Sequence, residues 1–340
     1  MVSNTKIIFA QVPTGYPEPG VHMKVEKSEI DLNADIPQGS VLLKVLCLSV
    51  DPYMRGRMRE AHKKYYSPAF PLGQPMNGHA MSQVVKSNNE KFKVGDLVYG
   101  MTPFVEYALI PEQFTSYLEV RNNAKDSGIP LTNFIGVLGM PGMTAYFGKP
   151  KKGETLYVSA ASGAVGQLVG QIGKILGLYV VGSAGSDEKV AYLKELGFDA
   201  AFNYKTKDIR EALKETCPNG IDIYFENVGG KMLEAVIDHA NTFARIVCCG
   251  MISQYNRENP EPIHNLIQVV AKSLEIVGFI VNNSPEMEGQ FRKDVTEWLK
   301  SGQIKYRETV TEGIEKTPEA LVDVLKGNNF GKQVVKVADL

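Results

Sequence analysis

Residues 155–189, TLYVSAASGAVGQLVGQIGKILGLYVVGSAGSDEK, set the architecture expected of this 340-residue chain. The stretch begins with β-forming residues, 155–159, and continues into a turn of Ala, Ser and Gly, 160–166. Apolar residues then recur at helical spacing as far as Gly177, a residue type that often ends helices, and a second apolar run starts at Leu178. The order strand, glycine turn, helix, strand predicts the unit that binds a dinucleotide.

The turn has the small residues that a bound pyrophosphate needs. Phosphate groups bind to backbone N–H groups at a helix N-terminus, so the side chains there must be small. Gly163 and Gly166 meet this need, in the spacing A-x-x-G-x-x-G from Ala160. The first glycine of the usual G-x-G-x-x-G pattern is absent, and the spacing alone also fits a turn that only packs a helix on a strand. Its position between two predicted strands favours the coenzyme site.

The rest of the chain divides into two kinds of sequence. Residues 155–281 alternate between predicted strands and helices, as expected for a doubly wound α/β domain with a six-stranded parallel sheet. The six expected strands are 155–159, 178–181, 200–203, 221–226, 243–249 and 274–281. Residues 1–123 instead carry short β-type runs separated by Pro, Gly and Asn, which indicate a β-rich domain. We expect the elements after the sheet to return to this first domain.

Length and composition favour a two-domain globular protein of the cell interior. We expect one domain at 1–125 with 295–340, and the other at 126–294. The 37 Lys and Arg balance the 38 Asp and Glu, so charge gives no reason to expect nucleic acid or a membrane as partner. The four cysteines lack C-x-x-C spacing and fit a reducing compartment. No apolar run has the length of a signal peptide or membrane span, so a cytoplasmic location is expected.

Seven longer motifs extend over nearly the whole chain. They are DPYMRGRM (51–58), LGMPGMTAY (138–146), YVSAASGAVGQLVGQ (157–171), GSAGSDEKV (182–190), NGIDIYFENVGGKML (219–233), CGMISQYN (249–256) and GKQVV (331–335). With these motifs the chain resembles the zinc-free medium-chain dehydrogenases/reductases, and especially plant NADPH-dependent alkenal double-bond reductases, kin to mammalian prostaglandin reductases. The resemblance implies a Rossmann domain, a β-rich GroES-like substrate domain, and a homodimer formed through the coenzyme domains.

The coenzyme is expected to be NADPH. An NAD site usually has an acid about 20 residues after the glycines, for the ribose 2′-OH. Here that position falls in residues 183–185, Ser-Ala-Gly, and Lys189 follows. Asp187 is the counter-argument, although an acid in a first helical turn also stabilises the helix dipole. Lys189 alone also fits an ordinary solvated helix residue. The resemblance favours a 2′-phosphate site, because Gly185, Lys189 and Tyr204 are all present.

The resemblance further implies a set of coenzyme-binding residues in turns and at strand ends. They are Pro52, Tyr53, Ala160, Gly163, Ala164, Val165, Gly166, Gly185, Lys189, Tyr204, Asn227, Cys249, Tyr255, Phe279, Ile280, Val281 and Asn329. No metal is expected. Zinc-dependent members have a G-H-E segment and a four-cysteine lobe, whereas here Ala80 follows His79 and no cysteine lies between Cys47 and Cys217.

Two tyrosines are the candidate catalytic residues. Reduction of a double bond conjugated to a carbonyl needs a hydride, a donor to the carbonyl oxygen and a proton for the α-carbon. The resemblance implies Tyr255 as donor or proton relay and Tyr53 as the residue that orients the carbonyl. Most of the 15 tyrosines must be structural, so without the motifs either one is more often a packing residue. An alcohol or ketone oxidoreductase and a non-catalytic NADPH-binding protein stay open as alternatives.

Three further features of the sequence concern the substrate pocket and the arrangement of the domains. Arg55, Arg57 and Arg59 follow Tyr53, and we expect them to form a solvated or salt-bridged surface. The segment 147–150, FGKP, is shorter than in the family, and residues 104–107, FVEY, lack the family's tryptophan. The first departure bears on the hinge between the domains or the dimer surface, and the second leaves the shape of the substrate pocket open.

Overall fold

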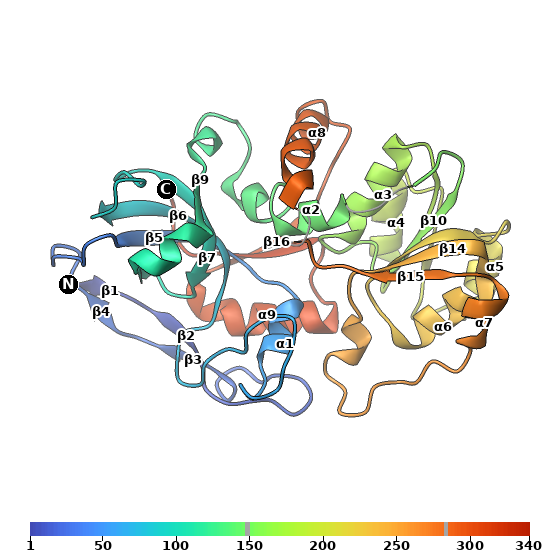
Figure 1. Ribbon diagram of the computed structural model, residues 1–340, viewed down its shortest axis with the longest axis horizontal. Helices are drawn as coiled ribbons and strands as arrows, with labels where there is room; N and C mark the ends of the chain where they lie inside the picture. Colours follow the sequence, from blue (N-terminus) through green and yellow to red (C-terminus); the bar gives the residue numbers. More distant parts are fainter. Residues whose placement is uncertain (147–149, 282–284) are drawn as a thin grey trace. The chain divides into compact units, whose positions relative to one another are not determined.

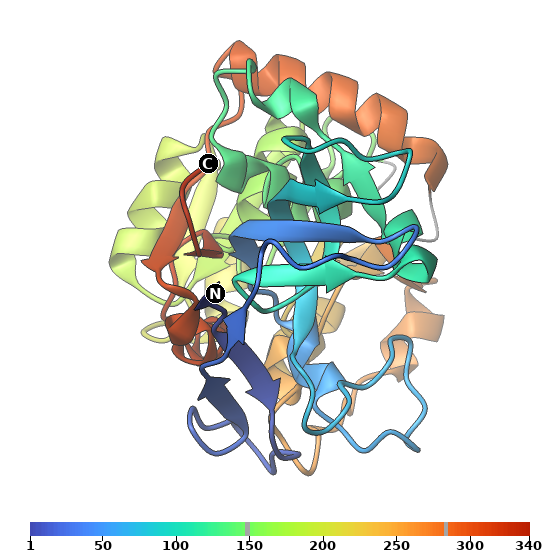
Figure 2. The same ribbon diagram turned by 90° about the vertical axis from the view of Figure 1, so that its left-hand side faces the viewer.

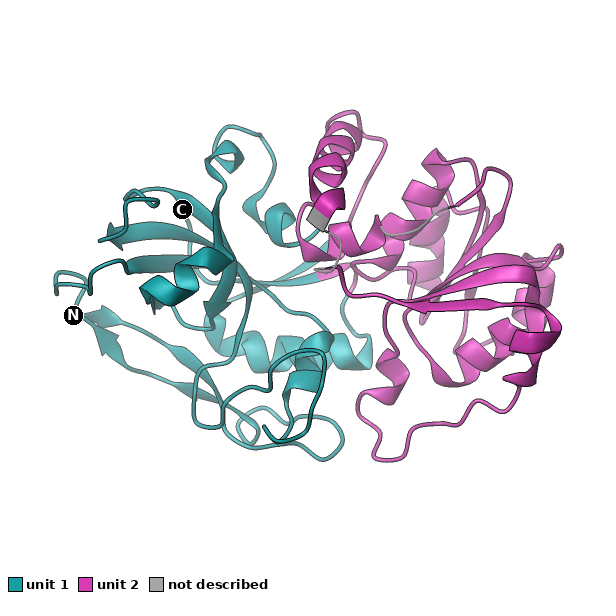
Figure 3. Cartoon of the chain, viewed as in Figure 1, with its two compact units in different colours: residues 1–136, 308–329, 333–340 teal, residues 137–307, 330–332 magenta. Residues whose placement is uncertain are grey.

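A computed structural model describes residues 1–146, 150–281 and 285–340. The chain forms two compact units (Figure 3). Unit 1 comprises residues 1–136, 308–329 and 333–340, and unit 2 comprises residues 137–307 and 330–332. The shortened segment noted at 147–150 lies mostly outside the described residues.

The unit boundaries differ from the expected 125/126 and 294/295. Helix α8 (Glu288–Lys300) was divided between the domains by the sequence analysis, but the whole helix belongs to unit 2. Its buried residues Phe291 and Val295 pack into an apolar core of that unit, and Asp294 accepts a hydrogen bond from the hydroxyl of Tyr146 at 2.5 Å. Residues on both sides of the expected boundary at 294/295 therefore pack in unit 2, and the boundary does not divide the helix.

Unit 2 is built on six parallel strands in the order β12-β11-β10-β13-β14-β15. Figure 1 labels β10, β14 and β15 of this sheet. In this order the bounds are Ala200–Asn203, Tyr179–Ala184, Thr155–Val158, Ile221–Glu226, Ala240–Cys248 and Glu275–Gly278. The predicted doubly wound sheet and its six strands are confirmed. The expected last strand, 274–281, was too long, since β15 ends at Gly278.

The central strands of this sheet are buried on both faces, which explains their unbroken apolar runs. On one face Val158 and Phe225 pack with helix α3 (Gly166–Ile175) and α8. On the other face Tyr157 and Tyr224 pack with α5 (Ile209–Thr216) and α6 (Gly230–His239). The remaining helices of the unit are α2 (Met140–Ala145), α4 (Asp187–Glu195) and α7 (Ile267–Ala271). Alternate residues of one strand thus supply two separate cores.

Unit 1 is β-rich, as predicted, and it holds both ends of the chain (Figure 2). Its seven-stranded sheet has the order β16-β17-β5-β6-β7-β9, with β8 paired to β5. The bounds are Glu308–Glu312, Lys332–Lys336, Val41–Ser49, Asn77–Ser87, Leu97–Pro103, Leu118–Val120 and, for β8, Tyr107–Ile110. Helix α9 (Thr317–Lys326), β16 and β17 do return to this unit, whereas α8 does not.

Smaller elements complete unit 1. Two hairpins pair β1 (Val2–Ser3) with β4 (Glu29–Ile30), and β2 (Lys6–Phe9) with β3 (Met23–Glu26). Helix α1 (Tyr53–Arg57) follows β5. Short 3₁₀ turns over both units are Glu112–Tyr117, Asn122–Ala124, Leu131–Ile135, Ile252–Gln254, Pro285–Met287 and Ile314–Lys316. No helix of the described residues is long and apolar enough to cross a membrane.

Candidate functional site

The turn after β10 has a backbone that only small residues allow. Ala160 adopts the left-handed conformation, with φ +48°. A Cβ on Gly166 would lie 2.5 Å from the Ala160 carbonyl oxygen and 2.7 Å from the Ala161 Cα, so glycine is required there. A Cβ on Gly163 would lie 3.2 Å from the same oxygen. The turn therefore presents backbone rather than side chains at the start of α3.

This start of α3 has the chemistry of an anion site. In the described part of the chain, the N–H groups of Val165 and Gly166 donate to no protein acceptor. No side chain caps the helix either. Free N–H groups and the positive end of the helix dipole together bind phosphate groups well. The arrangement suits a pyrophosphate.

Positive charge gathers after the next strand, β11. A Cβ on Gly185 would lie 2.9 Å from the Tyr204 hydroxyl and 3.2 Å from the Lys205 Cε. Burial, and next the charge of Lys205, lower the pKa of Lys189. Sequence reasoning missed Lys205, because a lysine beside a turn has no distinguishing pattern. Two neighbouring ammonium groups next to a glycine favour an anion at this position.

Asp187, the acidic residue that was the counter-argument to NADPH, forms a hydrogen bond within the protein. Asp187 accepts a hydrogen bond from the Asn203 side-chain amide at 2.8 Å, and so ties α4 to the end of β12. The Ser186 hydroxyl caps the same helix by accepting from the Lys189 N–H at 3.3 Å.

Another cation of unit 2 packs on an aromatic ring. The guanidinium of Arg307 covers the ring of Phe330, with its Cζ 3.8 Å from the ring centroid. Like Lys205, Arg307 is a cation that the sequence did not single out.

The turns after β10 and β13 are bonded to each other. The Asn227 side chain donates to the Ser159 carbonyl at 2.8 Å, and its backbone N–H donates to the Ser159 hydroxyl at 3.1 Å. The fully buried Glu226 accepts from the N–H groups of Val228 and Gly229, at 2.5 and 2.9 Å, and burial raises its pKa. These neighbouring strands flank the point where the strand order reverses, which is where doubly wound sheets bind ligands.

Tyr255 follows the end of β14 in this region. The Ile252 N–H donates to the Asn227 carbonyl at 3.0 Å, which holds the loop before Tyr255. The Tyr255 hydroxyl oxygen accepts a hydrogen bond from the Met251 N–H at 3.2 Å, and a phenol hydroxyl is both an acceptor and a donor. Cys249 lies at the start of this loop, and burial raises the pKa of its thiol to about 12, so the thiol is protonated at physiological pH and is not a nucleophile.

The sequence-predicted residues of unit 2 share one location. Each lies in the loop after the carboxyl end of one of the six parallel strands or on the helix that comes next. By strand they are Ala160, Gly163, Ala164, Val165 and Gly166 after β10; Gly185 and Lys189 after β11; Tyr204 after β12; Asn227 after β13; Cys249 and Tyr255 after β14; and Phe279, Ile280 and Val281 after β15. Carboxyl ends of parallel strands lie along one edge of a sheet. Their contact with a coenzyme stays a prediction.

The other three predicted residues belong to unit 1. Pro52 and Tyr53 begin helix α1, and Asn329 follows α9. Burial is the main cause that raises the pKa of Tyr53, so its phenol is a neutral donor at physiological pH.

The arginines after Tyr53 are not the solvated or salt-bridged surface that the sequence analysis expected. Their guanidinium groups donate to backbone carbonyls: Arg55 to Gly15, Arg57 to Pro68, and Arg59 to Ser67. They hold the loops around α1 in place.

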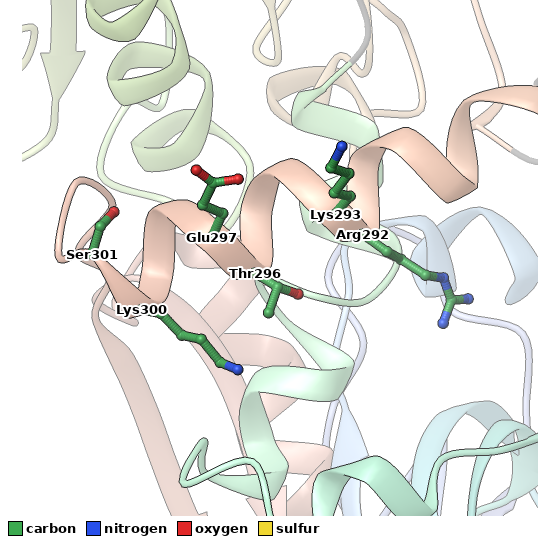
Figure 4. A pocket seen from close by; sticks show the side chains of 6 residues that line it. All are labelled: Arg292, Lys293, Thr296, Glu297, Lys300 and Ser301. Carbon is green, nitrogen blue, oxygen red and sulfur yellow. The ribbon is translucent and has the colours of Figure 1, made fainter.

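No group of three His, Cys, Asp or Glu side chains in the described ranges is arranged to hold a metal ion. A surface hollow lies along α8 (Figure 4) and contains none of the predicted site residues; its lining is Arg292, Lys293, Thr296, Glu297, Lys300 and Ser301. All six come from one helix and the residue that ends it, so the hollow is a surface feature of that helix.

Fold and site together define a class: a two-domain oxidoreductase with a dinucleotide domain. Comparison with known proteins agrees. Residues 5–117 match a family model described as the N-terminal domain of oxidoreductase, and residues 164–301 match one described as zinc-binding dehydrogenase.

Individual relatives are similar over the full length. The 2-alkenal reductase (NADP(+)-dependent) of Nicotiana tabacum is 47% identical, over 99% of this chain and 98% of its own. Prostaglandin reductase 1 of Mus musculus is 43% identical over 95% of each chain. The crystal structure of CurA from Vibrio vulnificus in complex with NADPH has a TM-score of 0.89, at 40% identity over 99% of this chain and 100% of that one. The chain belongs to the medium-chain dehydrogenases/reductases, in the zinc-free branch of NADPH-dependent double-bond reductases.

Proposed function

We propose that this protein reduces the carbon–carbon double bond of α,β-unsaturated aldehydes and ketones, using NADPH. One observation carries the proposal most directly: Lys189 and Lys205 gather beside Gly185, where an NAD site would have an acid. The names of the relatives, an alkenal reductase and a prostaglandin reductase, support the choice of substrate class.

The residues of unit 2 fit the coenzyme. The N–H groups at the start of α3 would hold the pyrophosphate, next to two glycines that leave no room for a side chain. Lys189, Lys205 and the Tyr204 hydroxyl would hold the 2′-phosphate. Asn227 and the loop from Cys249 to Tyr255 would border the nicotinamide end. Bound NADPH supplies the hydride, that is, one proton and two electrons, to the β-carbon of the substrate.

The two tyrosines would stabilise the negative charge on the carbonyl oxygen and transfer the proton to the α-carbon. As the β-carbon gains the hydride, negative charge develops on the carbonyl oxygen, and the Tyr53 hydroxyl stabilises it by donating a hydrogen bond. Tyr255 passes a proton toward the α-carbon and regains one from solvent. One hydride and one proton are thus added across the double bond, and the products are a saturated carbonyl compound and NADP⁺.

Product analysis tests this activity. The protein is mixed with NADPH and either 2-alkenals or 4-phenyl-3-buten-2-one, and the loss of coenzyme absorbance is followed. A saturated carbonyl product is expected. An unsaturated alcohol would instead indicate carbonyl reduction, and protein that binds NADPH but reduces none of these compounds would be a coenzyme-binding protein without this activity.

The Tyr255→Phe variant tests the proton relay. We expect turnover to fall about 100-fold, in the range for loss of a general acid, with little change in NADPH affinity. Unchanged turnover would remove Tyr255 from the mechanism.

We also propose a homodimer formed through the edge of the unit 2 sheet. Strand β15 pairs only with β14 in the described chain, and its four residues are all exposed, including Ile276 and Val277. Helix α7 precedes it with Ile267 and Val270 exposed by 71% and 76%. An exposed apolar edge strand is a template for pairing with another chain. A Val277→Lys variant should be monomeric in analytical ultracentrifugation; a wild-type monomer would contradict the proposal.

A cytoplasmic location completes the proposal. All four cysteines are free, which suits a reducing compartment. Fluorescence microscopy of a tagged chain would test it, and a signal confined to an organelle would contradict it.

A further inference from the structure

Residues 305–307 of unit 2 form a segment that two buried glutamines fasten to helix α3. The Gln171 side chain donates to the Lys305 carbonyl at 2.6 Å and accepts from the Lys305 N–H at 2.8 Å. In the same way Gln167 donates to the Arg307 carbonyl at 3.1 Å and accepts from the Arg307 N–H at 2.8 Å. The two glutamines are 1% and 3% exposed. The backbone of the segment is therefore fixed, whatever its side chains do.

The Arg307 backbone is also bonded next to the glycine turn after β10. The Lys332 N–H donates to the Arg307 carbonyl at 2.9 Å, and the Gly331 N–H donates to the Ser162 carbonyl in that turn at 3.0 Å. Gly331 has φ +69°, and a Cβ on it would lie 1.8 Å from the Arg307 carbonyl oxygen, so glycine is required. These bonds place Arg307 and Phe330 beside the turn that would hold the pyrophosphate.

The Arg307 side chain shares an aromatic ring with a lysine of the proposed coenzyme site. Its Cζ lies 3.8 Å from the centroid of the Phe330 ring, and the Lys189 Nζ lies 5.9 Å from the same centroid. Tyr192 packs edge-on against this ring, with 5.1 Å between the centroids, and its hydroxyl donates to Gln167 at 2.8 Å. Phe330 thus brings the cations of Arg307 and Lys189 to one place.

The positive charge of Arg307 is only weakly engaged. In the described chain its guanidinium donates no hydrogen bond, and its ion-pair partner is Glu188, at 3.5 Å between Nη1 and Oε1. The two side chains are 48% and 71% exposed, and such an exposed ion pair contributes little to stability. Lys189 adds a second positive charge on the same ring. Two cations that lie this close favour a bound anion with more than one negative charge.

We propose that Arg307 is a coenzyme-binding residue that contacts the 2′-phosphate of NADPH together with Lys189. A guanidinium stacked on an aromatic face keeps its N–H groups in the ring-parallel plane, where they match the oxygens of a phosphate. The phosphate, with a charge of about −2, replaces the single charge of Glu188 as the partner of Arg307. This inference rests on the proposed position of the 2′-phosphate at Lys189.

Ligands with and without a 2′-phosphate test this role. The dissociation constants of NADPH and NADH are measured by fluorescence titration of the full chain. That of adenosine 2′,5′-bisphosphate, which lacks the nicotinamide, is measured by calorimetry. The variant is Arg307→Ala, which keeps the backbone bonds of the segment. The matched control is Lys305→Ala, because Lys305 is also exposed and its backbone is bonded to α3 in the same manner.

The expected result is a selective loss. Arg307→Ala should weaken binding of NADPH and of the bisphosphate by about 5- to 10-fold, the lower range for a charged hydrogen bond because the side chain is half-exposed. NADH affinity should not change, and Lys305→Ala should stay within about twofold of wild type for every ligand. Equal losses for NADPH and NADH, or no loss for either, would show that Arg307 does not contact the 2′-phosphate.

Removal of the competing carboxylate gives the opposite sign. Glu188→Gln should bind NADPH about twofold more tightly, because Arg307 no longer has to leave a charged partner. Weaker NADPH binding by this variant would contradict the exchange of partners. Should urea unfolding show that Arg307→Ala is unstable, Arg307→Lys takes its place: it keeps the charge, loses the planar fork, and should show a smaller loss that is still confined to NADPH and the bisphosphate.

Failure of the inference and failure of the proposed coenzyme site are distinguishable. If wild-type protein binds NADPH no more tightly than NADH, the 2′-phosphate site at Lys189 is itself wrong. If Lys189→Ala loses the preference for NADPH and Arg307→Ala keeps it in full, the site stands and only the role of Arg307 is refuted.

Discussion

The two units hold their predicted site residues in different ways. In unit 2 the site is formed mainly by backbone: glycine turns after parallel strands expose N–H groups, and an added Cβ at Gly166 would meet backbone atoms. In unit 1 the site is formed by side chains. Tyr53 lies on a five-residue helix, and the arginines on and just after this helix bond to loop carbonyls. A backbone site suits a constant ligand such as a coenzyme, whereas a side-chain site can change with the substrate.

This difference predicts different failures. Damage to the backbone site should abolish coenzyme binding, because no rotamer change can restore an N–H group to its position. Damage to the side-chain site should slow turnover while the coenzyme still binds.

The largest effect is expected from Gly166→Val. Its Cβ alone would lie 2.5 Å from the Ala160 carbonyl oxygen, so the turn must move. We expect a loss of about 1–3 kcal/mol of unfolding free energy, as in other overpacked positions, and NADPH affinity too weak to measure by fluorescence titration. Gly289→Ala is the control, since no atom lies within 4 Å of the added Cβ in α8 and alanine favours a helix. Normal NADPH binding by Gly166→Val would refute a backbone site.

A smaller and more selective effect is expected from Lys189→Ala. Removing one charged contact to a 2′-phosphate costs about 1.5–3 kcal/mol, or about 10- to 150-fold in NADPH affinity, whereas NADH affinity should not change. Lys205→Ala should act in the same direction. Lys194→Ala, an exposed lysine of the same helix, is the matched control.

The dependence on pH gives this prediction a second test. Burial and Lys205 lower the pKa of Lys189, so its charge is lost at a lower pH than that of an ordinary lysine. NADPH affinity should therefore decline as pH rises through that pKa, and Lys189→Ala should lack this decline. Equal loss of NADH and NADPH affinity in the variant would argue for a structural lysine.

The sequence predicted unit 2 better than unit 1 for a physical reason. Strands buried on both faces give unbroken apolar runs, and a turn that requires glycine shows it in the sequence; β12 and β13 were predicted with their observed bounds. Arg57 was misjudged because an arginine in a charged segment has the same pattern whether it is solvated or buried. Its burial depends on Phe70 and Asn77, which only the tertiary fold brings to it.

Lys205 and Glu226 show the same limit within unit 2. The glycines Gly163 and Gly166 can be recognised because their spacing is local. By contrast, Lys205 neighbours Lys189 of α4, and Glu226 accepts one of its hydrogen bonds from Ser159 in the turn after β10. The helix α8 was divided at the wrong place because amphipathic spacing reveals a buried side but not which core it joins.

The smallest effect is expected from Tyr146→Phe, which tests whether side-chain bonds in unit 2 act on stability alone. The Tyr146 hydroxyl donates to Asp294, and burial first, then this carboxylate, raises the pKa of Tyr146 to about 12. Because an unfolded tyrosine has a pKa of about 10, the stabilisation from Tyr146 is fully present below pH 10 and is lost as pH rises toward 12.

Urea unfolding at pH 8 and pH 11 measures this contribution. At pH 8 the variant should be less stable by about 1 kcal/mol, the net worth of one hydrogen bond, and at pH 11 the gap to wild type should narrow. NADPH affinity should be the same in both proteins, because Tyr146 caps the end of α2 and does not follow a strand of the sheet. Tyr117→Phe, which alters an exposed tyrosine of unit 1, serves as control. A gap that widens with pH would show that Asp294 repels rather than holds the phenol, and a loss of NADPH affinity would contradict the division of labour between backbone and side chains in unit 2.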